Sequence, residues 1–301
     1  MRSMPAEPSI PPSLAPMLDA RRDGAAGVDS SRGLLMTLLG EFVMPDGGSV
    51  WTQTLVAALA LLDVRDKAAR QALARMEDRG WLARTRVGRQ TRWNLTDRSR
   101  ALLESGAERI YAFGREPRSW DQRWLVLLAS IPDTDRTARY RMTQGLSWAG
   151  FGSLGQGVWI SPWVDREQTV VQLMHELGIE ATVFRAEIGA MGSGGALAAQ
   201  AWDVLALHAE YEEFLLESKR VSQNPHRGAD ATRYLAALVH RWRRFPLLDP
   251  DLPDELLPDD WPGRAAAEAF AATRRRLLPA AWDWWRASET AYAPGGWRAD
   301  V

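Results

Sequence analysis

The chain of 301 residues contains no cysteine and only four histidines. The absence of cysteine excludes disulfide bonds, thiolate metal sites and cysteine nucleophiles. Neither a metal nor another cofactor is predicted, because the histidines show no close pair with ligand spacing: His175, His208, His226 and His240. No run of about 18 apolar residues is present, so no membrane span and no membrane partner are expected. The N-terminus also lacks a basic segment followed by an apolar one, which predicts a cytoplasmic protein.

Lysine is nearly absent, since only two of the basic residues are not arginine. Arginine suits contacts with phosphate and guanine, although a GC-rich genome produces the same bias. The net charge of −1 is unevenly distributed. Residues 31–112 carry 13 basic and 9 acidic residues, whereas residues 113–301 carry 21 basic and 25 acidic ones. The positive excess therefore lies in the first third of the chain. A hydrophobic content of 46% allows a large core, and the length predicts two or three domains.

An arginine-rich segment, residues 66–80, is typical of the recognition helix of a helix-turn-helix motif. Two helices are predicted before it, over residues 32–43 and 51–62, because apolar residues recur there at helical spacing. Thr52 or Thr54 is the expected N-cap of the second of these helices. Two helices, a short turn and a third helix are the element order of this motif.

Two short segments with alternating side chains follow the arginine-rich helix. Residues 81–86 and 90–95 predict two strands, and Gly88 supplies the positive φ that the hairpin tip requires. Thr96 is expected to cap a further helix. Together these elements predict a winged helix-turn-helix DNA-binding domain over residues 31–112.

The predicted recognition helix carries five residues on one face at helical spacing, and this face should point into the major groove: Lys67, Arg70, Gln71, Ala74 and Arg75. Arg65, just before the helix, is assigned to the same interface. Arg70 suits guanine O6 and N7, and Gln71 suits adenine N6 and N7. Solvated surface residues would show the same pattern, but the adjacent wing favours DNA.

Four arginines on the predicted wing are assigned to phosphates or to the minor groove: Arg84, Arg86, Arg89 and Arg92. Such contacts contribute affinity and salt dependence rather than sequence choice. Alternation places Arg84 and Arg86 on one face of the hairpin. A solvated surface is the alternative for each of them.

The rest of the chain predicts an α+β protein of several domains. Residues 1–30, rich in proline, alanine, glycine and serine, are expected to form a disordered arm. Residues 118–189 show the element order β-α-β-β-α-β, which predicts a ferredoxin-like middle domain. Residues 189–195 have the composition of a flexible linker. Residues 196–290 predict a helical C-terminal domain, interrupted by the proline-rich loop 246–262. Most of the 15 tryptophans are expected to be core anchors.

Several motifs resemble those of the phenylacetic acid catabolism repressor family, the PaaX type. They occur in the family's order over residues 31–287: Arg79-Gly80-Trp81-Leu82, Trp120-Asp121-x-Arg123-Trp124, Trp148-x-Gly150-Phe151-Gly152-x-Leu154-x-x-Gly157-Val158-Trp159-Ile160-Ser161-Pro162, Arg243-Arg244-Phe245 and Leu256-Leu257-Pro258-x-Asp260-Trp261-Pro262-Gly263. The resemblance implies a homodimeric bacterial transcriptional repressor of an aromatic-compound catabolic operon. Its middle domain would be similar to that of a CRISPR-associated nuclease. An aryl-CoA thioester such as phenylacetyl-CoA would release it from its operator.

The resemblance also requires an effector site, which we expect in the helical C-terminal domain. A CoA thioester combines phosphates with an apolar acyl group, so arginines beside aromatic residues should bind it. The residues assigned to this site are His240, Arg243, Arg244 and Trp261. The competing interpretation is a basic surface helix that pairs with the acidic loop 249–260.

The expected DNA partner is a double-stranded, pseudo-palindromic operator, because a homodimer presents two winged helices. The chain departs from the family pattern at Arg65 and Lys67, so its operator sequence is expected to be its own. The chain also departs from the family pattern in its tryptophans near the C-terminus, Trp282, Trp284 and Trp285. A regulator that responds to a different small-molecule catabolite is therefore an alternative.

Enzymatic alternatives have less support, and no catalytic residue is assigned. Asp133 follows a predicted strand, near where a related metal-dependent nuclease would place a catalytic aspartate. A single carboxylate at a Pro-Asp turn is, however, typical of a helix start. Residues 192–195 share only glycines with a phosphate loop, since no Lys-Ser or Lys-Thr follows them. A protein-interaction module would need a neutral recognition face, whereas this one carries Lys67, Arg70 and Arg75.

Overall fold

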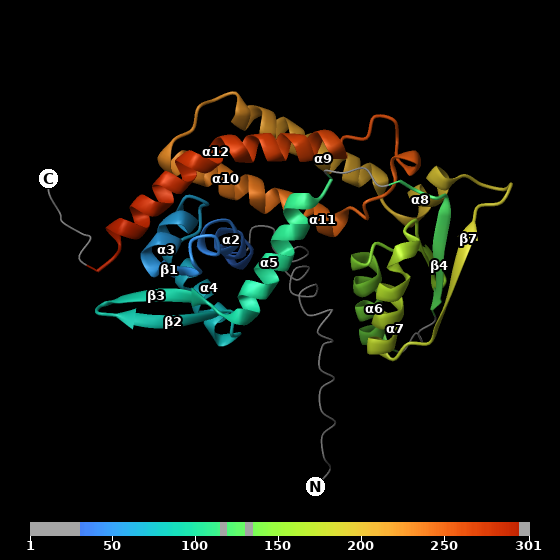
Figure 1. Ribbon diagram of the computed structural model, residues 1–301, viewed down its shortest axis with the longest axis horizontal. Coiled ribbons are helices and arrows are strands. Elements are labelled where there is room, and N and C mark those ends of the chain that lie inside the picture. The colour runs from blue at the N-terminus through green and yellow to red at the C-terminus, as the bar shows by residue number, and fades with distance from the viewer. Residues whose placement is uncertain (1–30, 115–118, 130–134, 295–301) are drawn as a thin grey trace, which may run out of the picture. The chain divides into compact units, whose positions relative to one another are not determined.

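The computed structural model describes residues 31–114, 119–129 and 135–294, which form an α+β structure with two small antiparallel sheets (Figure 1). They divide into two compact units. The middle unit comprises the described residues of 117–207 and 247–261. The N-terminal unit comprises residues 31–114, 208–246 and 262–294. The segment predicted as a helical C-terminal domain is thus divided between the two units. The arm predicted over residues 1–30 lies outside the described residues.

The N-terminal unit begins with α2 (Ser31–Leu38), which continues into the π-helical turn η1 (Leu39–Val43). The apolar residues that predicted this helix are all buried: Leu34, Leu35, Leu38, Leu39 and Phe42. A short strand that was not predicted, β1 (Ser49–Trp51), precedes α3 (Thr52–Ala60). The next helix is α4 (Asp66–Asp78), and Gly80 closes it with a φ of +70°.

The predicted threonine cap of α3 is wrong. The N-cap residue is Trp51, and no side chain caps the helix. The Thr52 hydroxyl instead donates to the Thr91 carbonyl at 3.0 Å and accepts from Trp93 Nε1 at 2.9 Å. Thr52 therefore ties α3 to the neighbouring strand, a role that local sequence does not reveal.

The predicted hairpin is confirmed as β2 (Leu82–Val87) and β3 (Gln90–Leu95), with Gly88 at φ +62° in the turn. Its sheet has the order β1-β3-β2, because β1 pairs with the outer edge of β3. The predicted cap of α5 (Asp97–Ala112) is also confirmed, since the Thr96 hydroxyl accepts a hydrogen bond from Ser99 N at 3.3 Å.

Three helices from the second half of the chain pack into the same unit: residues 208–222 of α9 (Val204–Ser222), α10 (Gly228–Trp242) and α12 (Gly263–Ala291). Figure 1 shows α10 running beside α12, with α2 and α3 below them. Phe42 of η1 stacks on Trp285 of α12 with ring centroids 4.7 Å apart. Trp242 of α10 stacks on Phe270 of α12 at 4.8 Å. Elements that are far apart in the sequence, η1 and α12, therefore share one aromatic core.

The middle unit has the predicted element order β-α-β-β-α-β. Its elements are β4 (Arg123–Ala129), α6 (Arg136–Trp148), β5 (Gly152–Gly155), β6 (Val158–Ser161), α7 (Glu167–Leu177) and β7 (Ala181–Glu187). The strands pair antiparallel in the order β5-β6-β4-β7. Leu125 and Leu127 of β4 pack on α6 and α7, which cover one face of the sheet (Figure 1).

The other face of the sheet packs on α8 (Gly194–Ala201) and on the 3-10 turn η3 (Asp254–Leu256) of the returning segment. The short helix α11 (Phe245–Leu248) contains the boundary between the two units. The prediction of a flexible linker is wrong at its end, because Gly194 starts α8 and Ser193 caps that helix by accepting from Ala196 N. A Cβ on Gly194 would lie 2.6 Å from Leu256 Cδ2. Close packing, and not flexibility, explains this glycine.

Candidate nucleic-acid interface

One face of α4 presents the side chains that were predicted to read DNA. Lys67, Arg70, Gln71, Ala74 and Arg75 are all exposed, as is Arg65 before the helix. The opposite face is buried and consists of Ala69, Ala72, Leu73 and Met76. The helix is therefore amphipathic in the sense that the sequence predicted, with its basic side turned to solvent.

Arg70 is held in one orientation by two acceptors. Its Nε and Nη2 atoms donate to the Asp66 carboxylate at 2.7 and 3.1 Å, and Nη2 also lies 3.4 Å from Gln53 Oε1 of α3. The hydrogen bond from Arg70 lowers the pKa of Asp66 below its ordinary value. The guanidinium remains about half exposed, with a side-chain exposure of 46%. Arg70 is thus oriented and still accessible.

The β2–β3 hairpin carries three exposed arginines beside α4: Arg84, Arg86 and Arg89. Arg84 Nε lies 3.1 Å from Glu77 Oε1, which links the hairpin to α4. Register pairs Arg84 with Trp93, so Arg84 and Arg86 project from one face of the sheet, as predicted.

Arg92 differs from the other three arginines, with which the sequence grouped it. It pairs with Thr85 and Trp51 and so lies on the opposite face of the sheet. Its Nε donates to Ser49 Oγ at 3.0 Å, and its guanidinium carbon lies 4.9 Å from the Trp51 ring centroid. Arg92 is half-buried, and its Nη2 is 3.9 Å from Glu289 of α12. Its interactions depend on β1, the strand that sequence analysis missed.

Two of the residues predicted to bind an effector, His240 and Arg243, share Thr37 Oγ1 of α2 as a partner. His240 Nδ1 lies 2.9 Å from Thr37 Oγ1, and Arg243 Nη1 donates to the Gly33 carbonyl at 2.8 Å. Both side chains therefore join α10 to α2. Arg244 is half-buried. Trp261 belongs to the middle unit, where it packs against the cluster that contains Trp124. In this structure, His240 and Arg243 therefore take part in helix packing.

The alternative interpretation was that this basic helix pairs with the acidic loop 249–260. Arg241 does not need the acidic loop for partners, because its Nη1 and Nη2 lie 2.7 and 2.8 Å from Glu217 and Glu213 of α9. These ion pairs connect α9 with α10 inside the N-terminal unit.

A buried ionic cluster that sequence analysis missed joins three elements of the N-terminal unit. Glu41 of η1 is fully buried and accepts a hydrogen bond from Arg274 Nη2 of α12 at 2.7 Å. Tyr111 of α5 donates its hydroxyl proton to the same carboxylate, and the Arg274 guanidinium carbon lies 4.5 Å from the Tyr111 ring centroid. Burial, aided by the negative charge of Glu41, raises the pKa of Tyr111. The one signal in the sequence for this ionic cluster was Glu41, an acidic residue within an apolar helix.

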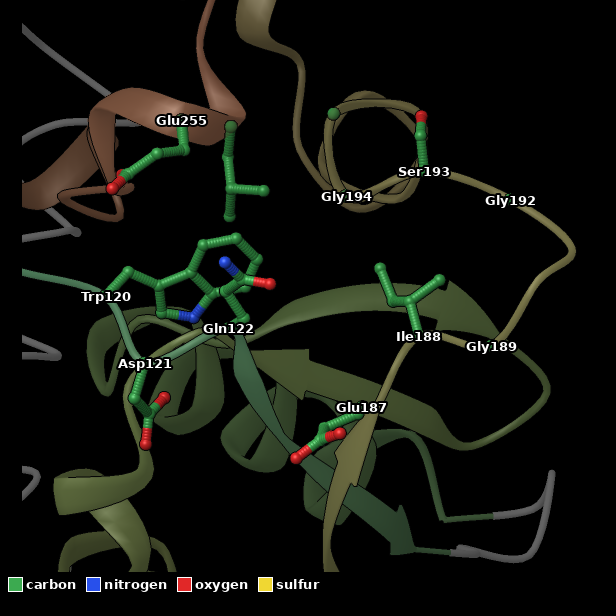
Figure 2. A pocket seen from close by; sticks show the side chains of 12 residues that line it. Trp120, Asp121, Gln122, Glu187, Ile188, Gly189, Gly192, Ser193, Gly194 and Glu255 are labelled. Carbon is green, nitrogen blue, oxygen red and sulfur yellow. The ribbon is translucent and has the colours of Figure 1, made fainter.

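The glycine-rich segment 189–195 lines a pocket of about 860 Å³ in the middle unit (Figure 2). Three carboxylates from separate segments border it, those of Asp121, Glu187 and Glu255, and its lining contains no lysine or arginine. Such a pocket repels phosphate. Asp133, the residue considered for nuclease chemistry, lies outside the described residues.

A second hollow, of about 480 Å³, lies between α9 and α12 in the N-terminal unit. Its apolar wall consists of Leu215, Leu216, Ala269 and Ala272, and the charged side chains of Glu212 and Lys219 also line it. The hydroxyl of Ser218, which also lines it, is buried without a hydrogen-bond partner. We refer to this hollow as the α9–α12 groove.

Over residues 31–114, 119–129 and 135–294, no group of three or more acidic, histidine or cysteine side chains is placed to hold a metal ion. Among the helices of the same residues, none has the length and apolarity of a bilayer span.

Comparison with known proteins identifies the family. Residues 30–99 match the family described as PaaX-like protein, residues 117–198 the PaaX protein central Cas2-like domain, and residues 202–287 the PaaX-like protein C-terminal domain. The solved structure of an uncharacterized protein from Mycobacterium tuberculosis is 24% identical, with a TM-score of 0.57 over 86% of this chain and 100% of that one, which shows a likeness in fold. The Transcriptional repressor PaaX of Escherichia coli (strain K12) is 32% identical over 263 residues, which cover 84% of this chain and 82% of that protein. The chain therefore belongs to the PaaX family.

Proposed function

We propose that this chain is a transcriptional repressor that binds double-stranded operator DNA through a winged helix-turn-helix. In this proposal α3 and α4 are the two helices of the motif, and the β2–β3 hairpin is the wing. The observation that carries it is the basic, exposed face of α4 beside a hairpin with exposed arginines. The name of the Escherichia coli relative, a transcriptional repressor, supports the same function.

Sequence choice is proposed to come from the N-terminal turns of α4. Arg70 would donate to guanine O6 and N7, and Gln71 would pair with adenine N6 and N7. Because Asp66 and Gln53 already orient Arg70, less side-chain entropy is lost when it binds a base. The hairpin arginines Arg84, Arg86 and Arg89 would contact phosphates or the minor groove and add salt-dependent affinity.

We further propose a ferredoxin-like fold for the middle unit and a homodimer for the whole protein. The strand order β5-β6-β4-β7, with two helices on one face, supports the fold, as does the match to a Cas2-like domain. A dimer would place two copies of α4 on a pseudo-palindromic operator.

The proposed effector is an aryl-CoA thioester such as phenylacetyl-CoA, and the operon controlled would serve aromatic catabolism. The α9–α12 groove supports the acyl-binding part of this proposal, since it offers apolar walls and one unpartnered hydroxyl, that of Ser218. It is better suited than the pocket of the middle unit, because its lining includes Lys219 as well as Glu212, whereas three carboxylates and no cationic side chain line the pocket of the middle unit.

Gel shift on the chain's own upstream DNA, with a panel of acyl-CoA esters, tests the function. We expect a shifted complex that an aryl-CoA ester releases. Cleavage of the DNA would instead support the nuclease alternative, and indifference to DNA would reject the repressor. Ala269→Trp should fill the groove and abolish release while DNA binding persists. Glu255→Trp, in the pocket of the middle unit, is the matched control and should leave release unchanged.

A further inference from the structure

The end of α12 reaches the corner where β1 passes into α3 (Figure 1). Glu289, in the last turn of α12, accepts a hydrogen bond from the Trp51 backbone N–H at 3.0 Å. Its carboxylate also lies 3.9 Å from Arg92 Nη2, and its side chain is only 13% exposed. A negative charge in the last turn of a helix is unfavourable for the helix dipole. This carboxylate is therefore held in place by its partners outside α12.

The corner around Trp51 and Arg92 presents converging donors to an oxyanion. The Trp51 N–H precedes the first turn of α3 and is not used inside the helix. Arg92 is positioned from two sides, by its hydrogen bond to Ser49 Oγ and by the Trp51 ring beneath its guanidinium. Glu289 shows that an oxyanion fits, because its carboxylate already occupies the corner, with Oε1 at the Trp51 N–H and Oε2 on the side of Arg92.

The same corner lies close to the proposed base-reading residues. Gln53, two residues after Trp51, is 3.4 Å from Arg70 of α4. Arg92 belongs to β3, which forms the proposed wing with β2. Backbone N–H groups at helix starts and arginine side chains are the groups with which proteins fix the DNA backbone.

We propose that the Trp51–Arg92 corner is a binding site for a DNA phosphate and that Glu289 competes with the DNA for it. The proposal rests on the proposed function, since it requires DNA on the α4 face. While Glu289 occupies the corner, one phosphate contact is withheld and the negative charge repels the DNA backbone. Withdrawal of the α12 end frees the contact. The position of α12 would thus set the affinity for any DNA sequence, independently of base reading by Arg70.

Glu289→Gln tests this proposal because it removes the charge and keeps the size and one acceptor oxygen. We expect Glu289→Gln to bind both operator and unrelated duplex more tightly by about 2- to 10-fold, the range of one net hydrogen bond. The plot of log K against log salt should steepen by about 0.9, the contribution of one additional phosphate. Asp283→Asn removes the same charge from an exposed position of α12. It should change the DNA affinity and the salt slope less than Glu289→Gln does.

Two further measurements separate the outcomes. Adding Arg92→Ala to Glu289→Gln should abolish the gain in affinity and in salt slope. Unchanged or weaker binding by a folded Glu289→Gln protein, with a normal unfolding midpoint, would overturn the proposal and make Glu289 a structural support of Arg92. Failure of the wild-type protein to bind DNA at all would instead overturn the proposed function, so the two failures are distinguishable.

Discussion

Glu41 and Arg274 form an ion pair of 2.7 Å across 233 positions of sequence, and the glutamate side chain in it is fully buried. A carboxylate removed from water in this way needs a charged partner or a proton. Arg274 supplies the charge and also covers the ring of Tyr111. The pair therefore fixes α12 to the helix that begins the N-terminal unit.

Arg274→Ala is expected to destabilise the N-terminal unit by about 3 kcal/mol, mainly because Glu41 is left buried without its cation. The measurement is the urea midpoint followed by tryptophan fluorescence. Arg275→Ala removes an exposed arginine from the next position and should shift the midpoint little. Equal shifts in the two variants would show that the ion pair contributes nothing specific.

Stability should fall as pH rises above the ordinary tyrosine pKa of 10.0. Burial and the charge of Glu41 raise the pKa of Tyr111 in the folded state, so the unfolded chain loses this proton first. The contribution is fully present below the unfolded pKa and is lost as pH climbs toward the raised value. Urea midpoints at about pH 8 and about pH 10.5 measure it. Tyr111→Phe should show a smaller decline, and an equal decline would assign the effect to other groups.

Arg70→Ala should lose discrimination between the operator and unrelated DNA. One bidentate contact to guanine is worth about 1 to 3 kcal/mol, or roughly 5- to 150-fold in relative affinity. Competition binding with both duplexes at one salt concentration measures this ratio. Arg136→Ala, at an exposed position of α6 in the middle unit, controls for the loss of a positive charge. Retained discrimination in Arg70→Ala would move the base-reading role to another residue.

Trp285→Ala should lower the free energy of unfolding by about 3 to 5 kcal/mol, because it removes a buried ring that stacks on Phe42. Thermal or urea unfolding measures the loss, and DNA binding should fail at a lower temperature than in the wild type. Trp284→Ala, at a half-buried neighbouring position, should cost less. If Trp285→Ala left unchanged the temperature at which operator binding fails, the DNA-binding elements would be stable without α12.

Local signals in the sequence predicted α4, the hairpin and the Thr96 cap, because each depends on residues that are close in the chain. They could not predict β1, which has three residues and exists through its pairing with β3. Without β1, the sequence grouped Arg92 with the exposed arginines of the hairpin, although its side chain lies on the opposite face of the sheet.

The effector assignment depended on contacts between distant segments. His240 and Arg243 were assigned from their chemistry alone, and the sequence did not reveal that α10 packs on α2 and that both side chains bridge the two helices. Composition alone cannot distinguish an arginine that awaits a phosphate from one that donates to a backbone carbonyl such as that of Gly33.

The stack of Phe42 on Trp285 also determines when the protein can fold during its synthesis. A ribosome releases η1 long before α12, so Phe42 lacks Trp285 and Glu41 lacks Arg274 while the intervening chain is made. A message that stopped before residue 263 would encode every proposed DNA-contacting helix and strand, yet leave this part of the core open. Such a fragment would be a substrate for cellular proteases rather than a permanent occupant of the operator.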